Sequence, residues 1–245
     1  DSVNFSSSGS SLKKGESFKD TVQNLEAMKI DAVVMRHPCP GSALKLTEFI
    51  DAVVINAGDG MHEHPTQAIL DMMSLHEQFG SLKGLKIGII GDIAHSRVAR
   101  SNIYGLSTMG AEVTLCGPPT LLPLYVDILP AKTSHALDEV IDWADAIIVL
   151  RLQMERMGQK LIPSVREYRS LFGITSERMK NHNKKIIVMH PGPMNRGIEI
   201  DSDVADGDYA IILNQVLNGV ASRMAILYLL LGKKMSEEAK SVESK

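Results

Sequence analysis

The sequence of 245 residues is poor in cysteine and in aromatic residues, and it has no excess of charge of one sign. Two cysteines, Cys39 and Cys116, are too few for a disulfide framework or a structural zinc site. This scarcity favours a reducing compartment, and we expect a cytoplasmic protein. The 26 Lys and Arg residues are balanced by 29 Asp and Glu residues, which argues against a nucleic-acid partner. No run of about 18 apolar residues is apparent, so we expect no membrane span.

Hydrophobic residues make up 44% of the chain, which excludes disorder as its dominant state. Short runs rich in Val and Ile predict strands at 31–35, 52–55, 86–90, 112–116, 146–150 and 184–189. Helical spacing of apolar residues predicts helices at 20–30, 43–50, 65–78, 98–109, 137–143 and 214–231, with Gly232 ending the last. Continuously apolar strands that alternate with helices indicate an α/β fold with parallel sheets covered on both faces.

Arginines follow several of the expected strands. In open parallel sheets, ligands bind at the carboxyl ends of the strands. Arg36, Arg97 and Arg151 come after three separate strands. One such arginine is usually half of a surface ion pair, but three can form a cationic pocket, because guanidinium groups bind carboxylate or phosphate through two parallel hydrogen bonds. Both interpretations are open on this pattern alone.

Motifs for other chemistries are absent or incomplete. Gly88-Ile-Ile-Gly91 lies between a strand and a helix but lacks G-x-G-x-x-G spacing, which disfavours a nicotinamide-dependent dehydrogenase. The sequence contains neither a Walker A loop nor a G-x-S-x-G nucleophile elbow. His62 and His64 have a spacing that can ligate metal, but no Cys or third His lies nearby, and we predict no metal site.

Several motifs, taken in one order, resemble the catalytic chains of the aspartate/ornithine carbamoyltransferase family. They are Ser11-Leu-Lys-Lys-Gly-Glu-Ser17, Val34-Met-Arg-His-Pro38, Val54-Ile-Asn-Ala-Gly-Asp-Gly60, His64-Pro-Thr-Gln67, Gly91-Asp-Ile-Ala-His-Ser-Arg97-Val-Ala-Arg100, Leu150-Arg-Leu-Gln-Met-Glu-Arg156 and His190-Pro-Gly-Pro-Met-Asn-Arg-Gly197. The resemblance extends from Ser2 to about Gly232. The His-Pro-Thr-Gln motif marks the whole family, whereas the first motif and the last two favour members that use aspartate as the acceptor.

This resemblance implies a fold and a reaction. The fold has two Rossmann-like parallel-sheet domains of the carbamoyltransferase type, joined by helices. The α-amine of aspartate attacks the carbonyl carbon of carbamoyl phosphate, phosphate leaves, and N-carbamoyl-L-aspartate forms, which in the family is the committed step of pyrimidine synthesis. No metal, organic cofactor or covalent intermediate is implied.

The resemblance also implies a domain organisation. Residues 1–78 correspond to the carbamoyl-phosphate-binding domain, which a C-terminal helix at 213–232 completes. Residues 84–210 correspond to the aspartate-binding domain. Two domains joined in this way form a hinge architecture that permits closure.

The carbamoyl phosphate site is implied residue by residue. His64 donates a hydrogen bond to the carbamoyl oxygen, and Arg36 contacts that oxygen and the phosphate. Gln67 and the backbone of Gly192 and Pro193 accept hydrogen bonds from the carbamoyl NH₂ group. Donors aimed at a carbonyl under attack suit the chemistry, because negative charge develops on its oxygen.

The aspartate site needs several cations, since aspartate carries two carboxylates. Arg97 and Arg151 match the arginines that bind aspartate in the family, and Gln153 lies beside the second. Lys14 matches a lysine that reaches into the site of a neighbouring subunit. The implied assembly is a homotrimer with shared active sites. A regulatory or pathway-enzyme partner is compatible with the sequence, which has no feature that specifies one.

One family motif is missing. In the family, a Ser-Thr-Arg-Thr loop at a helix N-terminus holds the phosphate, where backbone N–H groups and the helix dipole favour an anion. This run does not occur in the sequence. We therefore expect the Ser-rich start to be an interior loop of a longer protein, and residues 1–245 alone to be poorly active.

Two alternatives remain at this stage. The chain could be a carbamoyltransferase for another amine acceptor, although a cationic acceptor would not suit Arg97 and Arg151. It could also be a non-catalytic, carbamoyltransferase-like structural subunit. The missing Ser-Thr-Arg-Thr run is the feature in favour of a structural subunit, and the retained His64 and Gln67 argue against it.

Overall fold

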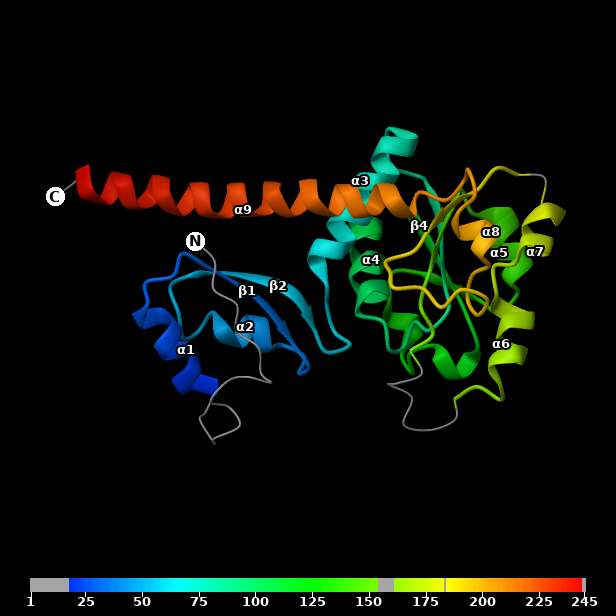
Figure 1. Cartoon of the computed structure of the whole chain (residues 1–245), viewed down its shortest axis with the longest axis horizontal. Coiled ribbons are helices and arrows are strands. Elements are labelled where there is room, and N and C mark those ends of the chain that lie inside the picture. The colour runs from blue at the N-terminus through cyan, green and yellow to red at the C-terminus, as the bar shows by residue number, and fades with distance from the viewer. Residues whose placement is uncertain (1–17, 154–160, 183, 244–245) are drawn as a thin grey trace. The chain divides into compact units, whose positions relative to one another are not determined.

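The computed structural model describes residues 18–153, 161–182 and 184–243 of the chain. The chain divides into two compact units, of which the first comprises residues 1–60 with 225–245 and the second comprises residues 61–224 (Figure 1). Helix α3 (Pro65–Phe79) belongs to the second unit, where it packs against α4 (Arg97–Thr108). The boundary at 78–84 between two substrate-binding domains stays a prediction.

The first unit contains a two-stranded parallel sheet with two helices. Its elements are α1 (Phe18–Ala27), β1 (Ala32–His37), α2 (Ser42–Leu46) and β2 (Val53–Asp59). Val22, Leu46 and Ile50 form the centre of its apolar core.

Both strands of the first unit are longer than predicted. Arg36 lies within β1 rather than after it, and the glycine-containing run 56–59, which follows the predicted strand 52–55, belongs to β2. The reason is the parallel pairing itself, which continues through an irregularity after Met35 to the pair His37 and Asp59. Hydrogen bonding between strands therefore overrides the local turn signal.

The second unit is built on a five-stranded parallel sheet. Its strands are β3 (Lys86–Ile90), β4 (Glu112–Cys116), β5 (Lys132–Ser134), β6 (Ala146–Val149) and β7 (Ile187–Met189), in the spatial order β5-β4-β3-β6-β7. From β3 the chain runs outward through β4 and β5, then returns to the other side of β3 to form β6 and β7. The strand order therefore reverses between β3 and β6, where open α/β sheets bind ligands.

Helices cover both faces of this sheet. In Figure 1, α3 and α4 lie on one side of the strands, and α5 (Leu137–Trp143), α6 (Val165–Phe172), α7 (Ser176–Asn181) and α8 (Ser202–Ala205) lie on the other. Two short 3₁₀ segments, Pro119–Leu121 and Val126–Ile128, precede β5. Side chains alternate along β6, so that Ile147 and Val149 pack with α5 and α6 while Ile148 packs with α3 and α4. A core on each face confirms the expected doubly covered parallel sheet.

The C-terminal helix α9 (Ile212–Glu243) is longer than predicted. Gly232 was expected to end it but lies inside it, since an isolated glycine costs a helix only about 1 kcal/mol. Residues Ile212–Gly232 also meet the length and mean hydropathy of a membrane span, with 22% of that window buried, although polar residues such as Asn218 and Arg223 interrupt the apolar sequence. Core helices of globular proteins meet the same criterion, so these properties do not by themselves assign the helix to a membrane.

Candidate active site

Three neighbouring strands of the second unit end in residues singled out by the sequence. After β3 the chain turns into α4, which begins at Arg97. Arg151 and Gln153 follow β6, and the Gly192–Pro193 turn follows β7. Because β3, β6 and β7 are adjacent and parallel, these segments leave the sheet at the same edge. This edge includes the point at which the strand order reverses.

The beginning of α3 is tied to α4. The His64 backbone N–H donates to Oγ of Ser101 at 2.8 Å, and Ser101 lies one turn after Arg97 on α4. His64 occupies the residue before α3, and its carbonyl accepts the N–H of Gln67 at 3.0 Å. Its imidazole makes no capping hydrogen bond to α3, and Nδ1 lies 3.4 Å from the Thr66 hydroxyl.

Asp92, which the sequence analysis did not select, joins two of the strand ends. Its carboxylate is fully buried. Oδ1 lies 2.7 Å from Nδ1 of His95, in the turn before Arg97, and Oδ2 accepts the backbone N–H of Gln153 at 3.4 Å. The Gln153 side chain donates back to the His95 carbonyl at 3.1 Å. These bonds connect the segment that carries Arg97 to the one that carries Arg151.

The turn after β7 is organised by His190. The His190 N–H donates to Oε1 of Gln215 at 2.9 Å, and its Nδ1 accepts the N–H of Gly192 at 2.9 Å. Gly192 has a positive φ of 65°, a conformation that glycine adopts without strain. Nε2 of His190 lies 3.4 Å from the buried carboxylate of Glu199. The imidazole therefore faces the protein interior, whereas Gly192 and Pro193 are exposed.

A second buried carboxylate, that of Asp71, accepts a hydrogen bond from the side chain of Gln67. Gln67 Nε2 and Gln215 Nε2 donate to Asp71 Oδ1 at 3.0 and 2.7 Å, and Asn102 Nδ2 donates to Oδ2 at 2.7 Å. Burial raises the pKa of Asp71 from 3.8 to about 6, even though these hydrogen bonds and the charge of Arg223 act to lower it. Asp71 was also missed by the sequence analysis; its position four residues after Gln67 on one helix face was the available signal.

Two predicted site residues belong elsewhere in the chain. Arg36 is an exposed residue of β1 in the first unit. Lys14 lies outside the described residues.

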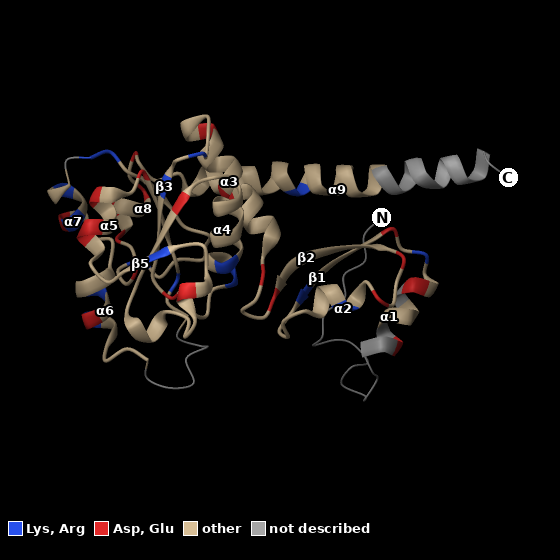
Figure 2. Ribbon diagram, turned by 180° about the vertical axis from the view of Figure 1, so that it is seen from behind, with Lys and Arg blue, Asp and Glu red and all other residues tan. Residues whose placement is uncertain are grey.

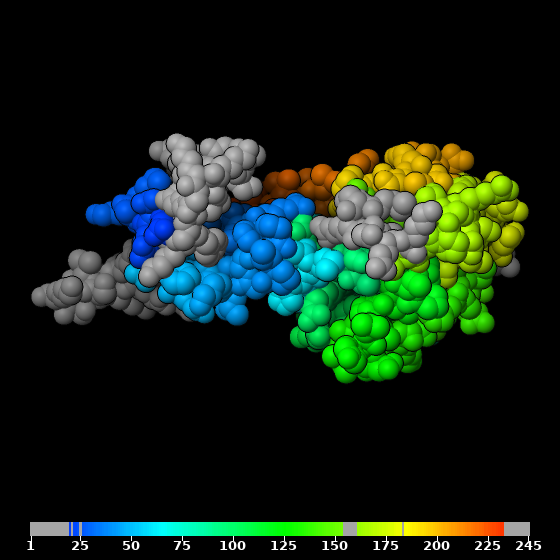
Figure 3. Space-filling view, turned by 90° about the horizontal axis from the view of Figure 1, so that it is seen from below, coloured from blue at the N-terminus to red at the C-terminus, as the bar shows by residue number. Residues whose placement is uncertain are grey.

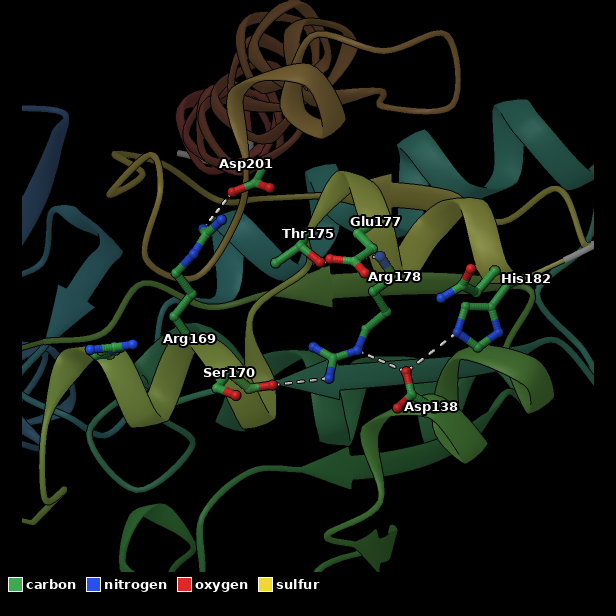
Figure 4. A pocket seen from close by; sticks show the side chains of 10 residues that line it. Asp138, Arg169, Ser170, Thr175, Glu177, Arg178, His182 and Asp201 are labelled. Carbon is green, nitrogen blue, oxygen red and sulfur yellow. Dashed lines mark hydrogen bonds and ion pairs between the residues drawn. The ribbon is translucent and has the colours of Figure 1, made fainter.

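The second unit also has a polar pocket of about 620 Å³ between α5, α6 and α7 (Figure 4). Nε of Arg178 donates to Asp138 at 2.7 Å, and Arg169 pairs with Asp201, which lowers the pKa of that carboxyl group. Figure 2 shows residues of both charge signs interspersed around these helices, and Figure 3 shows the adjoining surface of α6 and α7 in yellow-green. None of the predicted site residues that the structure describes lines this pocket, and its ion pairs tie neighbouring elements together.

Two family models match most of the chain. The carbamoyl-P binding domain of aspartate/ornithine carbamoyltransferase matches residues 1–77, and the Asp/Orn binding domain matches residues 83–230. The chain belongs to the aspartate/ornithine carbamoyltransferase family.

Relatives within this family point to the aspartate branch. The aspartate carbamoyltransferase catalytic subunit of Gemmatimonas aurantiaca is 56% identical over 234 residues, covering 96% of this chain and 73% of the relative. That of Syntrophotalea carbinolica is 53% identical over 239 residues, covering 98% of this chain and 76% of the relative.

The chain is also similar to solved structures of aspartate transcarbamoylase. Aspartate transcarbamoylase from Trypanosoma cruzi in complex with carbamoyl phosphate has a TM-score of 0.82 and 32% identity, covering 92% of this chain and 74% of that chain. Its complex with N-(phosphonacetyl)-L-aspartic acid has a TM-score of 0.80, with the same identity and coverage. The α/β carbamoyltransferase fold and the aspartate carbamoyltransferase activity expected from the motifs are thereby confirmed.

The buried carboxyl group of Asp71 predicts a pH-dependent stability. Its pKa is raised from 3.8 to about 6 in the folded carbamoyltransferase. The folded protein therefore keeps a proton that the unfolded chain releases, and the free energy of unfolding falls by about 3 kcal/mol as pH rises from about 4 to about 6. We expect Asp71→Asn to abolish this contribution, as measured by urea unfolding near both ends of that pH range.

The matched control is Asp127→Asn, which removes an exposed carboxylate of the same unit. It should leave the pH dependence of the wild-type protein intact. An Asp71→Asn protein that loses as much stability as the wild type over this range would contradict the assignment.

Proposed function

We propose that the chain transfers the carbamoyl group of carbamoyl phosphate to the α-amine of L-aspartate, in cytoplasmic pyrimidine biosynthesis. A C–N bond forms at the carbonyl carbon, the C–O bond to phosphate breaks, and the amine releases a proton. The products are N-carbamoyl-L-aspartate and phosphate. The main structural support is the edge at which β3, β6 and β7 end, since it carries Arg97, Arg151 and the Gly192–Pro193 turn.

The proposed carbamoyl phosphate site combines donors and acceptors. His64 donates a hydrogen bond to the carbamoyl oxygen, and Arg36 contacts that oxygen and the phosphate, so both stabilise the negative charge that develops there. Gln67 and the carbonyl groups of Gly192 and Pro193 accept from the carbamoyl NH₂, which has only donors to offer.

The proposed aspartate site is cationic. Arg97 and Arg151 bind the two carboxylates of aspartate, with Gln153 beside Arg151, and Lys14 comes from a neighbouring subunit. The bonds through Asp92 support this arrangement, because they hold the segments of Arg97 and Gln153 together. Holding the amine against the carbonyl carbon supplies further rate acceleration, which can reach about 7–11 kcal/mol.

Replacing His64 tests the carbamoyl site. Removal of one donor to a developing oxyanion typically lowers kcat by about 10²–10³-fold, and we expect His64→Ala to show this loss in carbamoyl-aspartate formation. His76→Ala, which replaces an exposed histidine on helix α3, is the matched control and should retain activity. Near-normal kcat in a folded His64→Ala protein would refute the role of His64.

Replacing Arg151 tests the aspartate site. Lysine keeps the charge but loses the paired hydrogen bonds, and a hydrogen bond between charged groups contributes roughly 1.5–3 kcal/mol. We expect Arg151→Lys to raise the KM for aspartate about tenfold or more and to change the KM for carbamoyl phosphate little. Arg166→Lys, at an exposed arginine of α6, should change neither constant. If another amine is accepted in preference to aspartate, the assigned acceptor is wrong.

Sharing of sites in a homotrimer gives a test in mixtures. If Lys14 acts in the site of a neighbouring subunit, inactive Lys14→Ala and His64→Ala proteins should recover part of the wild-type activity after their subunits are exchanged. Recovery requires mixed oligomers in which one site combines the intact Lys14 of the His64→Ala protein with the intact His64 of the Lys14→Ala protein. Sedimentation velocity measures the oligomeric state directly, and a monomer, or mixtures without recovery, would count against shared sites.

A further inference from the structure

The side chains around Asp71 form a buried polar cluster in the second unit that connects α3, α4 and the first part of α9. Asp71 and Gln67 lie on α3, Asn102 lies on α4, and Gln215 lies on α9. All four side chains are buried, and Asp71 accepts a hydrogen bond from each of the other three. Burying a carboxylate is costly, and these donors offset part of the cost.

The contact with Asp71 sets the orientation of the Gln67 amide. A carboxylate only accepts hydrogen bonds, so the NH₂ group of Gln67 must face it, as observed at 3.0 Å. The amide oxygen of Gln67 therefore points to the other side of the amide plane. If the amide were turned around, the oxygen of Gln67 would face the carboxylate, so that two acceptors would meet. Its NH₂ group would then face the NH₂ group of the ligand, so that two donors would meet.

A second connection runs from Asp71 to the turn after β7. The same oxygen, Oδ1, accepts from Nε2 of Gln215 at 2.7 Å, and this leaves Oε1 of Gln215 to accept the N–H of His190 at 2.9 Å. His190 in turn accepts the N–H of Gly192. One carboxylate thus orients an amide on α3 and, through Gln215, the residue that begins the Gly192–Pro193 turn.

We propose that Asp71 is a positioning residue, which presents the amide oxygen of Gln67 and the turn after β7 as preformed acceptors for the carbamoyl NH₂ group. This inference rests on the proposed function of Gln67, Gly192 and Pro193. Asp71 itself does not touch substrate. It acts by ensuring that these acceptors are oriented before carbamoyl phosphate binds, and misplacement by about 1 Å can cost 10²-fold in rate.

A neighbouring link between the same helices shows that Asp71 is not needed merely to join them. Asn218 of α9 donates from Nδ2 to the Ser74 hydroxyl at 3.0 Å and to Glu77 at 2.6 Å, both on α3. Asn218 is 5% exposed, and Ser74 is also buried. Among the described residues, no hydrogen bond of this link reaches Gln67 or His190. Asn218→Ala is therefore a matched control for the loss of a buried bond between α3 and α9.

The experiment compares Asp71→Ala, Asp71→Asn and Asn218→Ala in the full chain. We expect Asp71→Ala to raise the KM for carbamoyl phosphate about tenfold or more. Asp71→Asn keeps an oxygen that accepts from Gln67 and Gln215. Its new NH₂ group can donate to Oδ1 of Asn102 once the Asn102 amide turns around. Among the described residues, that oxygen is buried without a hydrogen-bond partner. It should stay within about threefold of the wild type. Asn218→Ala should lower the thermal midpoint and leave this KM unchanged.

A second ligand separates positioning from general damage to the site. N-(phosphonacetyl)-L-aspartate carries phosphonate and aspartate groups but no carbamoyl NH₂. If Asp71 acts on the acceptors for that NH₂, Asp71→Ala should weaken the binding of carbamoyl phosphate at least several-fold more than the binding of N-(phosphonacetyl)-L-aspartate. Equal weakening of both ligands, or an unchanged KM for carbamoyl phosphate in folded Asp71→Ala, would overturn the proposal.

Two further variants keep the outcome interpretable. Gln67→Ala tests the proposed function: normal kinetics would refute the role of Gln67, whereas a defect in Gln67→Ala with none in Asp71→Ala refutes only the positioning role. If Asp71→Ala does not fold, Gln215→Met removes the connection to His190 at similar volume. An unchanged KM for carbamoyl phosphate in folded Gln215→Met would then overturn the proposal, and a raised KM would support it.

Discussion

Parallel hydrogen bonding between β3 and β6 is the constraint on which the site depends. These strands are neighbours although β4, β5 and α5 lie between them in the chain. Their register pairs Ile87 with Ala146 and Ile90 with Val149, so both strands end at the same level. The connections then leave on opposite sides of the reversal in strand order, which opens a place for ligands between them. Arg97 and Arg151, which we propose to bind the carboxylates of aspartate, therefore lie where backbone geometry already favours binding.

Two buried carboxylates hold the segments around the site in place. Asp92 connects the turn after β3 to the segment after β6, and Asp71 connects α3, α4 and α9. A buried carboxylate without donors would be strongly destabilising, so each is stable only when its partners are in place. Their hydrogen bonds thus tie segments distant in sequence into one arrangement. Precise placement of substrate groups depends on such connections more than on the backbone alone.

Local sequence patterns predicted much of the sheet correctly. The strands at 86–90 and 112–116 were placed at their observed bounds, because each is a short, mostly apolar segment with β-branched side chains. Pro65 correctly marked the start of α3, whereas α4 begins at Arg97, one residue before its predicted start, after the side-chain cap of Ser96. The three-residue strand β5 and the helices α6 and α7 were missed, since each is too short to show a sustained pattern of apolar residues.

The sequence by itself determined the chemistry that is available, because residue types and the order of motifs such as His64-Pro-Thr-Gln67 are properties of the chain. From them the family, the reaction and the candidate residues followed. Only the tertiary structure decided which strands are neighbours and which buried side chains hydrogen-bond to the candidate residues. Asp71 and Gln215, for example, are separated by 144 positions yet share a hydrogen bond. Local periodicity carries no information about such a pair, since its energy appears only after the helices have packed and excluded water.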